Sequence, residues 1–450
     1  MATATQILGK FAAELRYSDI PPEVAARAKD CIIDSVAIAA FGSQLPWSRM
    51  VADYARTYGA DGPCTIIGRP DVRVQAPCAA LANGVFMHAF EHDQYRDPSV
   101  GAHPGATIVP AILAACEETG ADGKTAIVAF VASCEVLFRV GLAAHKSRIP
   151  PESIGFHAPG LTGPYAAAIA AGCVYGHNAE QHTHALGIAG SLSSGLLAFT
   201  KSTQGGMVKR LHLGRTAESG ILAARLAGSG YTGPETVLEG KFGFLDAYCR
   251  DGDPSLLTAD LNKVWETARI GLKRYAAHMT ANPPIQAVRN LIAQHKFSGA
   301  DVAHVVVEAS AKVLSHNNIL EPGDVMQAQY SVPFCVAFAM FHDPDDPSKF
   351  DESAVNDPAI RAVCRNVELR VRAQPGPSHW SANVHVELKD GRKVSYSGDS
   401  VKGMLVDPFK REDLQRKFMF LTKAMGSDAS ARLFERLERL EHEKGFSLAY

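Results

Sequence analysis

Acid–base side chains are concentrated in one short segment of the chain, between Ala82 and Pro110. Five of them stand within the thirteen residues 91–103: Glu91, His92, Asp93, Asp97 and His103. Prolines and glycines between these positions prevent a continuous helix, while apolar runs precede and follow. The segment predicts a polar loop between two buried helices, which can direct side chains into a cleft. A solvent-exposed loop is the alternative that this pattern leaves open.

Two further irregular regions carry basic side chains, one over 155–163 with 201–212 and one over 273–278. With the first segment they supply Asp93, His103, His157, Lys209, Lys273 and His278. If these regions converge, their lysines can bind carboxylates, and a histidine beside a carboxylate can transfer protons near neutral pH. The matching reaction is proton abstraction next to a carboxylate, followed by loss of hydroxide or carbon dioxide.

Each of these residues also has a plainer interpretation. A single lysine such as Lys273 is usually a solvated charge, and His212 and His316 are expected to be structural or exposed. Glu135 and Arg139 have the i,i+4 spacing of a helix ion pair. His103 and His157 are the strongest candidates, because each precedes an expected helix start, where free N–H groups attract anions.

The expected elements place these residues on a mostly α fold. Helices are predicted over 21–41, 47–58, 76–90, 106–119, 125–143, 164–171, 178–197, 215–227, 283–295, 328–341 and 411–440, with a short hairpin over 64–74. Strands are predicted over 302–309, 367–372, 384–388 and 393–396, the last two joined by an Asp-Gly turn. A chain of 450 residues exceeds one ordinary core. We therefore expect a large all-α helical domain, 1–267 with 401–450, and a smaller α+β domain, 268–400.

Composition excludes several classes of protein. A net charge of −2 gives no general attraction for nucleic acid. Nine cysteines without a CxxC pair argue against a zinc ribbon or a disulfide scaffold. The apolar runs, such as 106–116, are short for a membrane span, and the N-terminus resembles mature structure rather than a signal peptide. We expect a cytoplasmic protein with no membrane partner.

Six segments of the chain, taken in order, resemble the MmgE/PrpD family. They are ANGVFMHAFEHD, HPGATIVPAILA, GFHAPGLTGPYAAAIAAG, HALGIAGSLSSGL, KRLHLGRTAESG and VKGMLVDPFKREDLQRKF. The family contains 2-methylcitrate dehydratases, cis-aconitate decarboxylases and an iminodisuccinate epimerase. Single segments are weak signals, but six in the family's order cover nearly the whole chain.

The resemblance implies a helical domain completed by the C-terminal helices, an α+β lid, a homodimer, and no metal or other cofactor. It places active-site positions at Asp93, His103, His157, Lys209, Lys273 and His278. Lys209, Lys273 and His157 are expected to hold carboxylates, and Asp93 and His103 to move protons.

The chain departs from the family pattern at several positions. Glu91 stands where aspartate is usual, and Gln94 replaces the second residue of an Asp-Asp pair. Arg274 and Tyr275 follow Lys273 in place of a proline-rich pattern, and Phe334 replaces a tyrosine. We therefore take Arg274, Tyr275 and Phe334 as candidate substrate-binding residues.

The expected function is a cofactor-free lyase acting on a small di- or tricarboxylate, with dehydration of the 2-methylcitrate type preferred. Decarboxylation of the cis-aconitate type and epimerisation of the iminodisuccinate type begin at similar carbon centres and stay open. An inactive carboxylate-binding homologue is the alternative outside enzymes. A purely structural helical dimer would leave the three regions apart.

Overall fold

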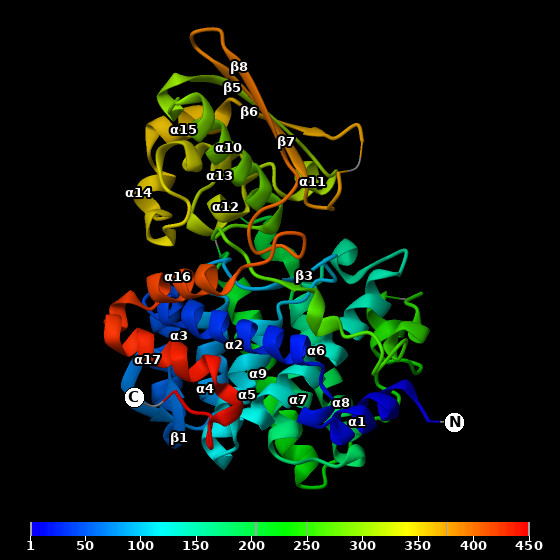
Figure 1. The fold of residues 1–450 in the computed structure, drawn as a ribbon. Coiled ribbons are helices and arrows are strands. Elements are labelled where there is room, and N and C mark those ends of the chain that lie inside the picture. The colour runs from blue at the N-terminus through cyan, green and yellow to red at the C-terminus, as the bar shows by residue number, and fades with distance from the viewer. Residues whose placement is uncertain (1, 203–204, 250, 375, 449–450) are drawn as a thin grey trace.

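The computed structural model describes residues 2–202, 205–249, 251–374 and 376–448. Helices make up 58% of the structure and strands 11%, so the predicted mostly α fold with a smaller α+β part is confirmed. Figure 1 shows the two parts, with the helical part below and the α+β part, here called the lid, above. Each has its own hydrophobic core.

The helical part is built from nine N-terminal helices and two C-terminal helices among the described residues. They are α1 Ala4–Glu14, α2 Pro22–Gly42, α3 Pro46–Tyr58, α4 Ala76–Met87, α5 Pro104–Thr119, α6 Gly123–His145, α7 Ala158–Val174, α8 Ala179–Gly190, α9 Val208–Gly228, α16 Arg411–Leu421 and α17 Ser427–Glu438. The predicted hairpin is present as β1 Ala60–Ile66 and β2 Arg69–Val74. A two-residue strand, β3 Tyr95–Arg96, pairs with β4 Ile270–Gly271 and joins the first polar loop to the segment that enters the lid.

Small residues let α9 lie close to its neighbours α4 and α7. A Cβ added at Gly214 would lie 2.4 Å from the carbonyl oxygen of Leu81, and one at Gly220 would lie 2.2 Å from the Cβ of Ala167. Neither contact is possible for a larger residue without moving a helix. This close packing fixes the start of α9, where Lys209 and Arg210 lie.

Several predicted helix limits were wrong, including the single helix over 411–440, which is divided into α16 and α17. Helix α7 begins at Ala158 and contains Pro164, which the sequence placed at the helix start. Pro164 has no N–H to donate to the carbonyl of Gly160. That carbonyl accepts a hydrogen bond from the Ser194 N–H at 3.2 Å instead. Helix α8 ends at Gly190, and α9 begins at Val208, so Lys209 lies on a helix rather than in a loop.

Helix α6 is long and apolar enough to cross a membrane, which differs from the expectation that the apolar runs are too short. An 18-residue stretch of this 23-residue helix reaches a mean hydropathy of 1.9, yet 89% of that stretch is buried inside the protein. Burial against α5 and α7 accounts for this composition.

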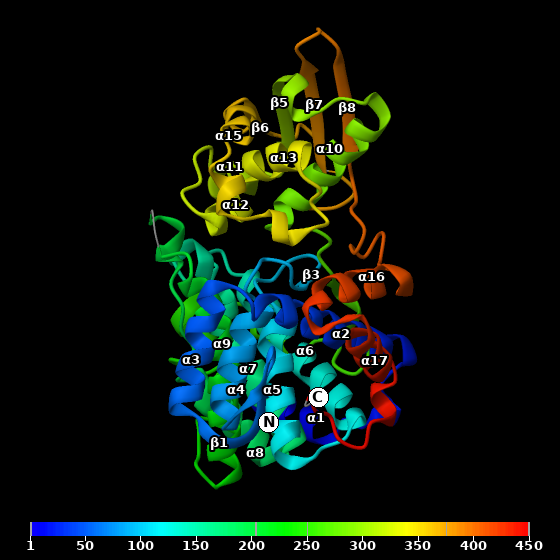
Figure 2. The same cartoon turned by 90° about the vertical axis from the view of Figure 1, so that its left-hand side faces the viewer.

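The lid consists of a four-stranded sheet with helices packed on it (Figure 2). Its strands are β5 Val302–Ala309, β6 Val367–Val371, β7 Ala382–Leu388 and β8 Lys393–Gly398, in the order β6-β5-β7-β8 with only the β5–β6 pair parallel. Its helices are α10 Asn282–His295, α11 Lys312–His316, α12 Val325–Tyr330, α13 Val332–Phe341, α14 Glu352–Val355 and α15 Pro358–Arg365. The helix predicted over 328–341 is divided at Ser331, whose hydroxyl caps α13 by accepting the Phe334 N–H.

The C-terminal helices pack on α2, below the lid (Figure 2). Phe418, Phe434 and Leu437 bury their side chains in the core of the helical part. Lys417 of α16 is almost fully buried, and its Nζ lies 2.7 Å from Asp34 Oδ1 of α2. The same ammonium donates to the carbonyl oxygens of His92 and Lys273, at 3.1 and 2.8 Å. One C-terminal side chain therefore ties two distant loops together.

Substituting Glu135 tests the buried ion pair that the sequence predicted. Its carboxylate lies 2.5 Å from Arg139 Nη1 and accepts the backbone N–H groups of Glu266 and Thr267, both at 3.1 Å. Glu135→Ala leaves a buried guanidinium without its carboxylate, so we expect a loss of about 3–5 kcal/mol in unfolding free energy. Urea denaturation measures it.

Glu14→Ala is the matched control, because Glu14 forms the same i,i+4 pair with Lys10 at 66% exposure. Its removal should leave the unfolding free energy nearly unchanged. Equal losses in the two variants would contradict the role given to burial.

Candidate active site

The first polar loop, between α4 and α5, is buried rather than solvated. Glu91, His92, Asp93 and Gln94 are each at most 4% exposed. Helix α4 ends at Met87 with His88 as its C-cap, and His103 is the N-cap of α5 ahead of Pro104. The interpretation of this loop as a solvent-exposed segment is therefore wrong.

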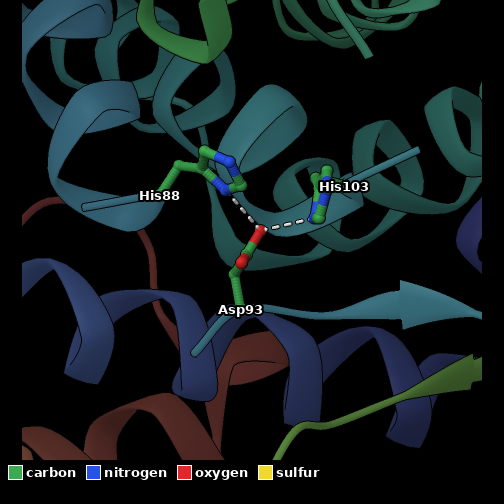
Figure 3. Close-up of side chains that lie close together, drawn as sticks. All are labelled: His88, Asp93 and His103. Atoms are coloured by element: carbon green, nitrogen blue, oxygen red, sulfur yellow. Dashed lines mark hydrogen bonds and ion pairs between the residues drawn. The ribbon is translucent and has the colours of Figure 1, made fainter. Parts of the chain in front are cut away.

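Asp93 joins two histidines from the two ends of this loop (Figure 3). Its Oδ2 lies 2.9 Å from His88 Nδ1 and 2.8 Å from His103 Nδ1. Burial on its own would raise the pKa of Asp93, but His103, His88 and Lys273 hold it well below its usual value. Because the carboxylate is ionised and can only accept, both histidines must present an N–H at Nδ1.

His88 is neutral and donates its Nδ1–H to Asp93. Its side chain is fully buried, and burial lowers the pKa of its imidazole to about 3. His103, by contrast, has a side chain 17% exposed and lines a cavity. With Nδ1 engaged by Asp93, the Nε2 edge of His103 is the one available for proton transfer.

Glu91 forms a second buried centre next to Asp93. Its carboxylate pairs with Lys209 through Oε1 and lies 3.4 Å from Lys273 Nζ through Oε2. Lys273 also lies 3.7 Å from Asp93 Oδ1. Although burial would raise the pKa of Glu91, Lys209 and Lys273 hold it well below its ordinary range.

A cavity of about 590 Å³ opens beside His103, between the helical part and the lid. The three regions found in the sequence converge on it, because His103, His157 and His278 all line it. Tyr330 of α12 completes this wall, with its ring 4.9 Å from that of His278. The structural-dimer alternative, which required the regions to lie apart, is therefore wrong.

His157 stands at the N-terminal end of α7 and is paired with another histidine. Its Nδ1 lies 3.0 Å from His212 Nδ1, so one ring donates and the other accepts. Burial, followed by the charge of Lys209, lowers the pKa of His157 well below its usual value. His157 is thus a neutral hydrogen-bonding group on the cavity wall.

Lys209 and Lys273 are not on that wall, which differs from their expected role as carboxylate ligands. They are 1% and 3% exposed and point to Glu91. Lys209 Nζ also lies 4.7 Å over the Tyr330 ring, which separates it from the cavity. Their positive charges are largely used to hold Glu91 and Asp93 ionised.

The structure also places Arg274, Tyr275 and Phe334 away from this cavity. Arg274 binds Asp345 of the lid at 2.7 and 2.6 Å and lines a separate cavity of about 300 Å³. Tyr275 is buried and donates to Gln286 Oε1 at 2.8 Å, while Phe334 is fully buried against Phe350. Their assignment to substrate binding needs correction, because each side chain is directed into lid contacts.

Sequence reasoning did not select His88 and Tyr330 as site residues. His88 stands five positions before Asp93 in the first of the six family-like segments, a signal that could have marked it. Tyr330 carried no comparable signal, since its position depends on how the lid packs over α9.

The cluster of His88, Asp93 and His103 also has the spacing of a potential metal site, with one ligand atom of each within 4.8 Å of the others. Zinc would need about 2.0–2.2 Å to each atom. The distances of 2.8 and 2.9 Å instead match hydrogen bonds that share Asp93 Oδ2. The arrangement suits proton transfer better than ion binding.

A buried acid–base cluster at a cavity between a helical domain and a small α+β domain defines an acid–base enzyme. Comparison with family models gives the MmgE/PrpD N-terminal domain over residues 6–257 and the MmgE/PrpD C-terminal domain over 275–442. The chain belongs to the MmgE/PrpD family, which is a family of lyase type.

Its similar relatives include several cis-aconitate decarboxylases. The protein of that name from Aspergillus terreus is 28% identical over 95% of this chain and 91% of its own length. Human cis-aconitate decarboxylase is 27% identical over 95% of this chain and 89% of its own length. The cis-aconitate decarboxylase-like protein oryM of Aspergillus oryzae is 28% identical over 97% of this chain and 93% of its own length.

The buried neutral histidines predict how stability depends on pH. Burial lowers the pKa of His88 and His182 to about 3, whereas an unfolded histidine titrates near 6.5. Below pH 6.5 the unfolded chain binds protons that the folded chain refuses, so stability should fall as the pH drops from 7 towards 4. Each such histidine contributes up to about 1.4 kcal/mol per pH unit.

Urea midpoints between pH 7.5 and 5 measure this slope. His182→Leu, away from the cavity, should flatten it, whereas His385→Leu on the exposed face of β7 should leave it as it is. A wild-type profile that is flat over this range would contradict the assignment.

Proposed function

We propose that the chain is a cofactor-free lyase that decarboxylates cis-aconitate or a closely related unsaturated tricarboxylate. The observation that carries the proposal is the presentation of His103 to the cavity by the buried carboxylate of Asp93. The names of the relatives support decarboxylation over the dehydration that the sequence favoured. Epimerisation and 2-methylcitrate dehydration remain outcomes of the test below.

The reaction balances with one proton supplied by the enzyme. The bond between the methylene carbon and its carboxylate breaks, and its electron pair forms a new terminal double bond. The electron pair of the original double bond then takes a proton at the carbon of that bond that is farther from the methylene group, and carbon dioxide leaves. A general acid at the cavity wall is therefore required.

His103 is the group placed to give that proton through Nε2. Asp93 keeps the ring oriented and stabilises its protonated form in the transition, as the buried carboxylate of an acid–base pair does. His88 donates to the same oxygen, Asp93 Oδ2, and so helps to keep this carboxylate in place. His157, His278 and Tyr330 line the cavity and can donate or accept hydrogen bonds to the substrate carboxylates.

Proton NMR of the pure protein in deuterated buffer tests the reaction. The panel contains cis-aconitate, 2-methylcitrate, citrate, malate-type acids and iminodisuccinate. We expect vinylic methylene signals and carbon dioxide from cis-aconitate, with one deuterium entering the product. New vinylic signals from 2-methylcitrate would instead identify a dehydratase, and deuterium exchange without a new compound would identify an epimerase. Either of these would overturn the decarboxylase.

His103→Ala tests the assigned acid. Turnover should fall by a factor on the order of 10²–10⁴ because the proton donor is lost. The circular dichroism spectrum should be unchanged, because the side chain is at the cavity surface. His304→Ala, which removes an exposed histidine of β5, is the control and should keep wild-type turnover. Unchanged turnover in His103→Ala would remove His103 from the mechanism.

A further inference from the structure

A second hollow of about 210 Å³ adjoins the main cavity. The two share Thr200, Lys201, His316 and Tyr330. We call this hollow the side arm and define it by Phe199, Lys201, Arg210, Ile319, Met326 and Tyr330. Its walls are largely apolar, but two cations belong to it.

Arg210 is a buried cation without a carboxylate partner. It is 2% exposed, and it forms no ion pair with a described carboxylate, although its charge is among those that lower the pKa of Glu91. Among the described residues its guanidinium makes three long contacts, each 3.4 Å, to the carbonyls of Ala89 and Gly206 and to Gln329 Oε1. Arg139, equally buried, has Glu135 at 2.5 Å. Buried charges in proteins are normally paired, so Arg210 is an exception that points to an absent anion.

The charges of the surrounding cluster lead to the same conclusion. Lys209, Lys273 and Arg210 are three cations, whereas Glu91 and Asp93 are two carboxylates. The nearby Lys417 is already neutralised by Asp34 at 2.7 Å. The buried histidines add no charge, since burial lowers the pKa of His88 and of His157. One positive charge is left over, and Arg210 is the cation farthest from a partner.

Lys201 supplies a second positive charge at the rim. It lines both hollows, its side chain is exposed, and it forms no ion pair within the described part of the chain. Phe199, Ile319 and Met326 line the side arm together with these two cations. An apolar passage between two cations suits a carboxylate carried on a hydrocarbon stem.

We propose that the side arm is a substrate subsite that binds a carboxylate on an apolar stem, with Arg210 and Lys201 as its ligands. The subsite then admits polycarboxylates longer than cis-aconitate, whose far carboxylate is separated from the reacting end by several methylene groups. This rests on the proposed function, which puts the reacting end at His103. Lys209 and Lys273 are directed to Glu91 and do not bind anions at the cavity wall. In this proposal Arg210 and Lys201 supply the positive charge for the substrate instead.

Calorimetric titration with saturated dicarboxylates tests the subsite without requiring turnover. The probes are succinate, glutarate and adipate, with hexanoate as the probe that has the stem but lacks the second carboxylate. Adipate should bind at least about tenfold more tightly than succinate or hexanoate, because it alone among these probes can place one carboxylate at Arg210 and a second in the main cavity. Hexanoate binding as tightly as adipate would overturn the proposal.

Two substitutions identify the ligands. Arg210→Met should weaken adipate binding by about 10- to 100-fold, since a charge-assisted hydrogen bond is lost, and Arg210→Lys should restore part of it. Lys201→Gln at the exposed rim cannot disturb the core and should weaken adipate binding several-fold. Arg215→Gln is the control on the same helix, because its side chain is exposed and paired with Glu218. Wild-type adipate affinity in folded Arg210→Met, or in Lys201→Gln if Arg210→Met does not fold, would overturn the proposal.

The two proposals fail separately. Adipate binding that depends on Arg210, with no turnover of any panel compound, would keep the subsite and remove the decarboxylase. If cis-aconitate is turned over but adipate affinity is unchanged by substitution of Arg210 and Lys201, the lyase is supported and the subsite is contradicted.

Discussion

The structure depends on keeping two carboxylates, Glu91 and Asp93, ionised where water is excluded. Burying one charge is costly, and burying two close together is worse unless partners surround them. The chain supplies those partners from distant positions: Lys209 from α9, Lys273 from the entry to the lid, and His88 and His103 from the two ends of one loop. The close packing of α9 against α4 and α7 is what brings Lys209 to this point.

This arrangement separates the groups that stabilise the site from the groups that face the cavity. The lysines lie behind Tyr330 and Glu91, whereas the cavity wall consists mainly of histidines, hydroxyl groups and apolar side chains. Glu91, where the family usually has aspartate, is one methylene longer and lies within 3.4 Å of Lys273 while also pairing with Lys209. A change of one methylene in a buried acid can therefore alter which cations remain for the substrate.

Much of the fold could be predicted from the sequence because it is encoded locally. Periodicity, helix-start prolines and the Asp390-Gly391 turn gave most helices and the strands of the lid. The start of α9 was missed because Gly205 and Gly206 suggested a longer loop, and the position of Pro164 inside α7 depends on a carbonyl bonded by Ser194, far along the chain.

The candidate site was predicted as a set of residues but not as a geometry. His103, His157 and His278 were selected from their surroundings in the sequence, and they line one cavity. The directions of the Lys209, Arg274 and Phe334 side chains were not predictable. Each contacts residues that are distant in the sequence and come close only in the folded chain. Arg210 was not selected as a site residue beside Lys209 for the same reason, since its significance lies in the lack of a carboxylate within ion-pair distance.

Lys417 has a consequence for the synthesis of the protein. Its ammonium holds the carbonyls of His92 and Lys273 against Asp34, so residues from four widely spaced stretches meet on one nitrogen. On the ribosome, the helices up to α9 can pack long before α16 has emerged. The loop bearing Asp93 and the segment bearing Lys273 are clamped only when that last stretch arrives. These contacts can therefore form only after α16 has been synthesised, when the earlier helices are already available to pack.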